Sequence, residues 1–288
     1  MQVFNRYEVK YIITQAQYEG ILQALLAAEN MRLDRYNQTG ESYPIQSLYY
    51  ASVTDAVSQQ ALRLEPNEFK QRLRVRSYGP ATAAKPVFLE IKKKFLKKTY
   101  KRRITVDYET ANRFLIAGEL PDNQIGREVL ALARKQLQPV IKVAYERVAL
   151  HATSCDSDLR ISFDTDIRTS TLDLNISNQT IGENLLPAGM VLMEIKTELG
   201  MPTFLRRIVA DYQLRPTSFS KFERGLKRSF QESDETYTDI LQKEIAHAEF
   251  NFYNEQFWNC HHITNVYHCD GDGHDIRTRD SLGLLENL

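Results

Sequence analysis

Charged residues recur at every second position of several strand-like segments. The clearest is 86–94, where Glu90, Lys92 and Lys94 alternate with apolar residues. Because successive strand residues point to opposite faces of a sheet, these three charges share one face. Six further segments repeat the pattern, with faces that carry Glu8 and Lys10; Arg72, Arg74 and Arg76; Lys101 and Arg103; Tyr145 and Arg147; Arg160 and Asp164; Glu194 and Lys196.

These faces carry eleven basic but only four acidic residues, although the whole chain has 37 of each and no net charge. On a single strand, a basic run is usually a face turned to water. Solvent faces normally mix Thr, Ser, Gln and acidic residues, however, so the same bias on seven segments favours a dedicated binding surface.

A surface with this much positive charge suits a dense polyanion such as a linear triphosphate or polyphosphate. Arg guanidinium groups match phosphate oxygens bidentately, and Lys contributes point charge. The few carboxylates are candidate ligands for a hard divalent cation, Mg²⁺ or Mn²⁺, that bridges phosphate oxygens. Phosphoryl transfer needs mainly positioning and charge stabilisation, so it requires no Ser–His or Cys–His pair.

Short strands interleaved with amphipathic helices must position these residues. Thr14 and Gln17 form a capping-box pattern at the start of the first helix. Further helices are expected at 54–62, 109–117, 126–138 and 203–213, and strands at 3–13, 45–51, 69–78, 86–94, 100–107, 140–150, 159–165 and 190–197.

The helices have to bury their apolar stripes, and the apolar face of the sheet is the available partner. The alternative is a barrel with apolar side chains in the lumen and charges outside, which leaves the helices without a partner. The sequence therefore predicts an α+β fold, a β-barrel with charges inside and helices packed outside.

Composition narrows the class of protein. Zero net charge disfavours a globally basic nucleic-acid-binding protein, and aromatic residues are not interleaved with the basic runs as single-strand binding requires. The sequence contains no apolar run of about 18 residues and no signal-peptide pattern. Three irregularly spaced Cys residues do not form a disulfide framework. A cytoplasmic protein is expected.

Eight short motifs occur in order along the chain: E-x-K, R-L-R-V-R, L-E-I-K-K-K, Y-K-R-R, A-Y-E-R, L-R-I-S-F-D, M-E-I-K and S-F-S-K-F. In this order they resemble the VTC-type polyphosphate polymerase domain in its stand-alone bacterial form, a branch of the triphosphate tunnel metalloenzyme superfamily related to CYTH proteins. The resemblance covers about residues 1–228. Each motif alone is weak, but eight in order are specific.

The resemblance implies an eight-stranded antiparallel tunnel that transfers the γ-phosphate of ATP onto a growing polyphosphate and releases ADP. It assigns Glu194 to the metal, Mn²⁺ or Mg²⁺. The catalytic, phosphate-binding positions that it implies are Lys10, Arg74, Arg76, Lys92, Arg147, Arg160, Lys196 and Lys221. Candidates for substrate binding around them are Glu8, Arg72, Glu90, Lys94, Lys101, Arg103, Tyr145 and Ser220.

Within this set, Glu90 and Asp164 are expected to orient basic side chains rather than to bind metal. Lys101 and Arg103 compete for one basic position of the family. Ser220 and Lys221 follow Pro216 in an expected loop, so only the resemblance places them at the tunnel.

Arg6 stands where the hydrolytic and cyclase branch of the superfamily has a metal-binding Glu, which favours the polymerase branch. A tripolyphosphatase or nucleoside triphosphatase that uses the same tunnel, and a non-catalytic polyphosphate-binding module, remain alternatives. In the fungal members of this family, the domain is accompanied by a phosphate-sensing domain and by membrane helices. Neither is expected in this sequence, and association with a separate membrane protein is an open alternative.

The sequence divides into a catalytic domain over 1–230 and a helical, partly disordered tail over 231–288. A helix at 236–258 is possible. Cys260, His261, His262, His268 and Cys269 invite a zinc interpretation, but their spacing matches no familiar zinc site.

Overall fold

The computed structural model describes residues 7–37, 41–52, 69–95, 98–133, 137–153, 158–179 and 182–230. The expected helix at 54–62 and the whole tail, with its Cys and His residues, lie outside the described residues. The described strands are β1 (Tyr7–Thr14), β2 (Met31–Leu33), β3 (Tyr43–Ser52), β4 (Phe69–Tyr78), β5 (Val87–Phe95), β6 (Lys98–Val106), β7 (Leu137–Ala152), β8 (Arg160–Ser170), β9 (Glu183–Asn184) and β10 (Met190–Thr197).

In the described part of the chain, these ten strands form one antiparallel sheet. Eight follow the path β1-β10-β8-β7-β3-β4-β5-β6, while the short β2 and β9 pair with β7 and β8. Each of the eight segments expected from alternation corresponds to one strand of this path. The sequence pattern missed β2 and β9 because strands of three and two residues are too short to show a period.

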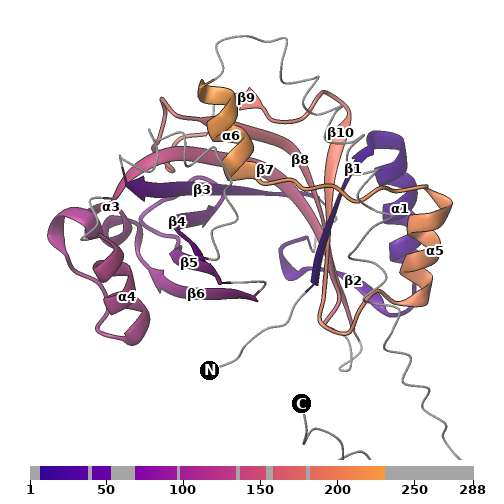
Figure 1. Ribbon diagram of the computed structural model, residues 1–288, viewed down its shortest axis with the longest axis horizontal. Helices are drawn as coiled ribbons and strands as arrows, with labels where there is room; N and C mark the ends of the chain where they lie inside the picture. The colour runs from indigo at the N-terminus through magenta and orange to yellow at the C-terminus, as the bar shows by residue number, and fades with distance from the viewer. Residues whose placement is uncertain are drawn as a thin grey trace, which may run out of the picture.

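The sheet is strongly curled (Figure 1), but within the described residues it does not close into the expected eight-stranded barrel. Its path ends at β1 on one side and at β6 on the other. The outer edge of β1 is occupied by another segment: Tyr11 forms a bridge with Pro216, and the Thr217 N–H donates to the carbonyl of Lys10 at 2.8 Å. This segment therefore occupies part of the edge of β1 that closure of a barrel would use.

Four helices pack against the outer face of the sheet: α1 (Gln15–Ala27), α3 (Tyr108–Ala117), α4 (Gln124–Ala133) and α5 (Thr203–Asp211). Figure 1 shows α3 and α4 beside the β3–β6 half, and α1 and α5 beside the β1–β10 half. The expected capping box is present, since Thr14 and Gln17 each accept the other's backbone N–H at the start of α1. Helices on the apolar face are thus confirmed.

The helix α6 (Lys221–Phe230) lies on the opposite, charged face. Phe222 and Leu226 pack against Ile141 of β7. At Gly225 the approach is so close that a Cβ would lie 2.6 Å from a methyl carbon of Ile141 and 2.8 Å from one of Thr169. A residue without a side chain is therefore needed for α6 to reach the sheet at this depth.

Two expectations about local structure are wrong. The helix expected at 126–138 ends at Ala133, and β7 has begun by Leu137. Lys221 is the first residue of α6 rather than part of a loop, because the Ser220 carbonyl accepts the Arg224 N–H and so starts the helix. This correction matters for the site, since a helix holds Lys221 more rigidly than a loop.

Candidate functional site

Glu194 of β10 lies at the centre of the first charged group on the inner face. Its carboxylate is 2.7 Å from the Nζ of Lys196, 3.3 Å from that of Lys221, 3.8 Å from that of Lys10 and 3.8 Å from the guanidinium of Arg147. We call these residues, with Asp164, the Glu194 cluster. Antiparallel register places Lys10 directly opposite Glu194, so strand pairing brings residues from the two ends of the chain together.

Asp164 supports this cluster from beneath. It is fully buried and accepts two hydrogen bonds from Arg147, at 2.6 and 2.7 Å, and one from Lys221 at 2.5 Å. Buried charges need paired, hydrogen-bonded partners, and a bidentate Arg–carboxylate pair fixes the guanidinium plane. Asp164 therefore orients Arg147 and Lys221 in the manner expected from the sequence.

Glu90 of β5 organises a second group, the Glu90 cluster, with Arg74, Arg76, Lys101 and Arg103. Its carboxylate, 1% exposed, lies 2.5 Å from Arg74, 2.5 Å from Arg103, 3.2 Å from Lys101 and 3.9 Å from Arg76. Both candidates for the family's basic position, Lys101 and Arg103, thus contact the same acid. Each cluster is one central carboxylate surrounded by four cations.

Tyr145 connects the two clusters. Its hydroxyl accepts a hydrogen bond from Arg76 at 3.3 Å, and the Nζ of Lys221 lies 4.6 Å from the centre of its ring. Tyr49 and Ser47, which the sequence analysis missed, accept hydrogen bonds from Arg74 at 2.8 Å and from Arg76 at 3.1 Å. They share one face of β3, and the same alternation rule could have found them.

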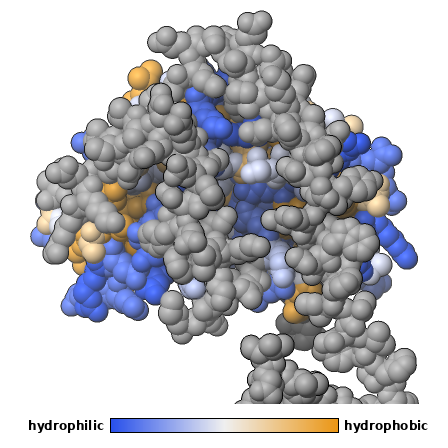
Figure 2. All heavy atoms as spheres, viewed as in Figure 1, coloured by the Kyte–Doolittle hydropathy of each residue, from blue (hydrophilic) through white to orange (hydrophobic). Residues whose placement is uncertain are grey.

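The charges of Lys92 of β5 and Glu8 of β1 influence each other's pKa, although the two strands lie near opposite ends of the sheet path. Glu8 lies 3.1 Å from Lys10. Loss of water around Lys92 lowers its pKa, and the charges of Lys10 and Arg74 lower it further, while Glu8 raises it. Charges on strands near opposite ends of the sheet path thus shift each other's pKa. The inner face is therefore one continuous electrostatic environment. Figure 2, which has the same orientation as Figure 1, shows hydrophilic residues in the middle of the view.

Arg72 and Arg160 pair with acids other than the two central carboxylates, although Arg160 is the register partner of Lys196. Arg72 pairs with Glu223 of α6, and Arg160 pairs with Asp34 at 2.5 Å. Ser220 accepts a backbone hydrogen bond at 3.4 Å as α6 begins. The side chain of Lys94 lies outside the described residues, although its backbone belongs to β5.

The cations hold both central carboxylates in the ionised form. Burial alone would raise the pKa of Glu194, but Lys196, Lys221, Lys10 and Arg147 bring it well below its usual value. The pKa of Glu90 is lowered in the same way by Arg74 and Arg76. At neutral pH each of the two central carboxylates is therefore negatively charged. Its charge offsets the repulsion among the surrounding cations when no other anion is bound.

Lys101 is a group of the inner face whose charge should change near neutral pH. Loss of water and the charge of Arg74 lower its pKa to about 7, even though Glu90 acts in the opposite direction. A bound polyanion favours the charged lysine, so binding above this pKa must take up a proton. We expect the affinity for tripolyphosphate to fall roughly threefold to tenfold as pH rises through 7. The effect is modest because 47% of the side chain is exposed.

Titration calorimetry below and above this pKa, in buffers of different ionisation enthalpy, measures both the affinity and the proton uptake. Lys101→Arg should keep tight binding at high pH and lose the proton uptake, while Lys101→Met should weaken binding at low pH. An unchanged pH profile in Lys101→Arg would contradict the assignment.

A divalent cation would fit this site with one or two protein carboxylates and with substrate oxygens. Among the described residues, no three His, Cys, Asp or Glu side chains lie close enough together to hold a metal. Mg²⁺ and similar ions are commonly bound by one or two carboxylates plus phosphates and water. Glu194, 6% exposed at the centre of the Glu194 cluster, suits that arrangement.

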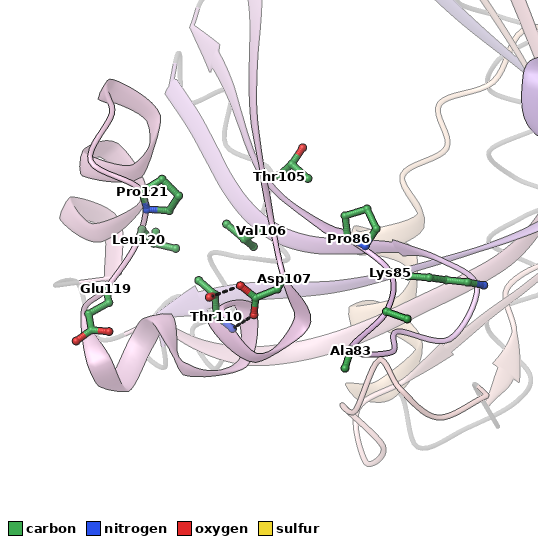
Figure 3. Close-up of a pocket in the computed structure, with 11 residues that line it drawn as sticks. Ala83, Lys85, Pro86, Thr105, Val106, Asp107, Thr110, Glu119, Leu120 and Pro121 are labelled. Atoms are coloured by element: carbon green, nitrogen blue, oxygen red, sulfur yellow. Dashed lines mark hydrogen bonds between the residues drawn. The ribbon is translucent and has the colours of Figure 1, made fainter.

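A groove of about 590 Å³ lies elsewhere, between the end of β6 and the start of α3 (Figure 3). Asp107 and Thr110 line it, but Asp107 accepts the N–H and the hydroxyl of Thr110 and so caps α3. These two polar side chains therefore serve the local structure of the helix start.

Comparison with protein families decides the relationship. Residues 5–230 match the family model described as the VTC domain. The chain belongs to the VTC domain family. This match spans the elements from β1 to α6 that carry the Glu194 and Glu90 clusters. The resemblance of the eight sequence motifs is thereby confirmed.

Other comparisons give only distant likenesses to this VTC domain. A search of curated proteins found no match. A candidate adenylate cyclase from Bacillus halodurans aligns at 12% identity and a TM-score of 0.46, over 80% of this chain and 98% of that one. A Pyrococcus horikoshii protein aligns at 14% identity and a TM-score of 0.32, over 83% of this chain and 98% of that one. Within the described residues, none of the helices has the length and apolar character that a membrane crossing requires.

Proposed function

We propose that this VTC-domain protein is a metal-dependent polyphosphate polymerase, which transfers the γ-phosphate of ATP onto a growing polyphosphate and releases ADP. The observation that carries the proposal is the pair of carboxylate-centred clusters, with eight cations on one inner face joined through Tyr145. Family membership supports the same chemistry.

The two clusters suit a reaction between two polyanions. A terminal phosphate oxygen of the acceptor attacks the γ-phosphorus, a new P–O bond forms, and the bond to ADP breaks with its electron pair leaving on ADP. The acceptor oxygen is already ionised, so no protein base is needed. The obstacle is charge repulsion, and cations held in place before the reaction lower it in the transition state.

Each part of the site has a role in this proposal. Arg147 and Lys221, oriented by Asp164, hold the transferring phosphate, while Arg74 and Arg76 hold the neighbouring phosphates. Lys10 and Lys196 flank Glu194, which would bind Mn²⁺ or Mg²⁺. When bound, such an ion would neutralise charge on the phosphate oxygens.

The test is to incubate the purified protein with ATP and Mn²⁺ and to separate the products on a gel stained for polyphosphate. ADP release together with a ladder of long polyphosphate is expected. ADP with orthophosphate alone would assign the protein as a triphosphatase instead. Tight tripolyphosphate binding without ATP turnover would leave a binding module, the third function that this face can serve.

A further inference from the structure

Three tyrosines gather at one end of the charged inner face: Tyr36 of the 3-10 helix η1 (Arg35–Asn37), Tyr43 of β3 and Tyr78 of β4. The rings of Tyr36 and Tyr78 are stacked, with centroids 4.6 Å apart and planes 10° from parallel. The ring centroid of Tyr43 lies 5.4 Å from that of Tyr36 and 5.9 Å from that of Tyr78. We call this group the tyrosine cluster.

The tyrosine cluster is not simply part of the core. Tyr43 is buried, but Tyr36 remains 37% exposed although it contacts both other rings. Tyr36 therefore presents aromatic surface to solvent at the rim of a phosphate-binding face.

The position of the tyrosine cluster relative to the cations is what a nucleotide requires. Tyr78 lies two residues beyond Arg76 on the same face of β4, and Tyr43 is the register partner of Arg147. The cluster therefore adjoins members of both charged clusters. Two residues of a strand span roughly 7 Å, a length that one ribose can bridge between a base and its first phosphates.

Arginines reinforce the aromatic surface. Arg35 lies 4.8 Å from the ring centre of Tyr36 and donates to its hydroxyl at 2.8 Å. Arg103 lies 4.4 Å from the ring of Phe88, and Phe88 packs edge-on against Tyr78 at 5.6 Å. Aromatic rings and planar guanidinium groups are the surfaces on which nucleic-acid bases stack.

We propose that the tyrosine cluster binds the base of a nucleoside triphosphate by stacking, with the phosphates running from Arg76 toward Lys221. This inference rests on the proposed function, because it takes the phosphate site as given. Stacking engages the π face of any base, so the site should favour purines for their larger surface and distinguish ATP from GTP only weakly.

The experiment compares ATP, GTP, CTP and inorganic tripolyphosphate by titration calorimetry on the full chain, without metal to exclude turnover. We expect Tyr36→Ala to weaken ATP and GTP binding by about tenfold to a hundredfold and to leave tripolyphosphate affinity unchanged. Tyr36→Phe keeps the ring and should bind ATP like the wild type.

Two outcomes overturn the inference: unchanged ATP affinity in Tyr36→Ala, or equal losses for ATP and tripolyphosphate. Failure of the wild type to bind tripolyphosphate would instead count against the proposed function. If the wild type still bound ATP in that case, and this binding required the Tyr36 ring, the base site would be supported and the polymerase activity would not.

Discussion

Replacement of Glu194 by glutamine is expected to lower ATP turnover by roughly a hundredfold or more, the size of effect seen when one group aimed at the transition state is removed. Glutamine has almost the same shape, and Asp164 still compensates Arg147 and Lys221, so the fold should be kept. Glutamine is neutral, so it cannot supply the carboxylate that a divalent ion prefers. The cations that surround residue 194 are unchanged in the variant.

The same Glu194→Gln variant should bind tripolyphosphate at least as tightly as the wild type when no metal is present. Removing the central negative charge leaves Lys10, Arg147, Lys196 and Lys221 available to the ligand. Turnover and metal-free binding thus change in opposite directions, which a misfolded variant could not imitate.

Glu198→Gln is the matched control, because Glu198 is exposed just beyond the end of β10. Steady-state ADP release and calorimetry are the measurements. Retention of wild-type turnover in Glu194→Gln would remove Glu194 from the proposed metal site.

The second large effect is on stability. Glu90→Gln should lower the free energy of unfolding by about 3 kcal/mol, since four cations lose the buried carboxylate that compensates them. The pKa of Glu90 is lowered in the folded protein, so this contribution is complete above about pH 4.5 and disappears as pH falls further. The variant should therefore lose less stability in acid than the wild type.

A polyanion should rescue Glu90→Gln. Tripolyphosphate at a hundred times its dissociation constant stabilises a binding protein by about 2.7 kcal/mol, and the uncompensated cations should make the gain larger in the variant. Denaturant unfolding with and without tripolyphosphate measures this difference.

Glu128→Gln serves as the control for Glu90→Gln. Glu128 pairs with Arg102 and Lys93 on the outer face, so we expect a loss of less than about 1 kcal/mol and no special rescue. Equal stability changes in the two variants would contradict the special role of Glu90.

Much of this architecture could be predicted because it depends on a period of two. Alternation located all eight long strands and placed Glu90 and Lys92 on the inner face, since a strand fixes which side a residue faces whatever its partner. It also predicted helices on the other face, because an apolar stripe needs an apolar partner.

The parts that could not be predicted depend on contacts between distant segments. Nothing near Pro216 in the sequence shows that its segment covers the edge of β1, so a closed barrel was expected. Lys221 was expected in a loop because it follows Pro216, whereas α6 begins at Lys221 and packs closely against the sheet at Gly225. The Arg160–Asp34 pair likewise joins segments that no local pattern connects.

The register of β1 with β10 has a consequence for how the chain acquires its structure. β4, β5 and β6 are neighbours in sequence and can form early, because closing short loops loses little entropy. Lys10 meets Glu194 only after about 180 intervening residues have been brought into place. Contacts so distant in sequence slow folding, so the Glu90 cluster should assemble first and the Glu194 cluster last. Under the proposed function, a refolding chain would then form one group of phosphate-binding cations before the group that contains the proposed metal ligand.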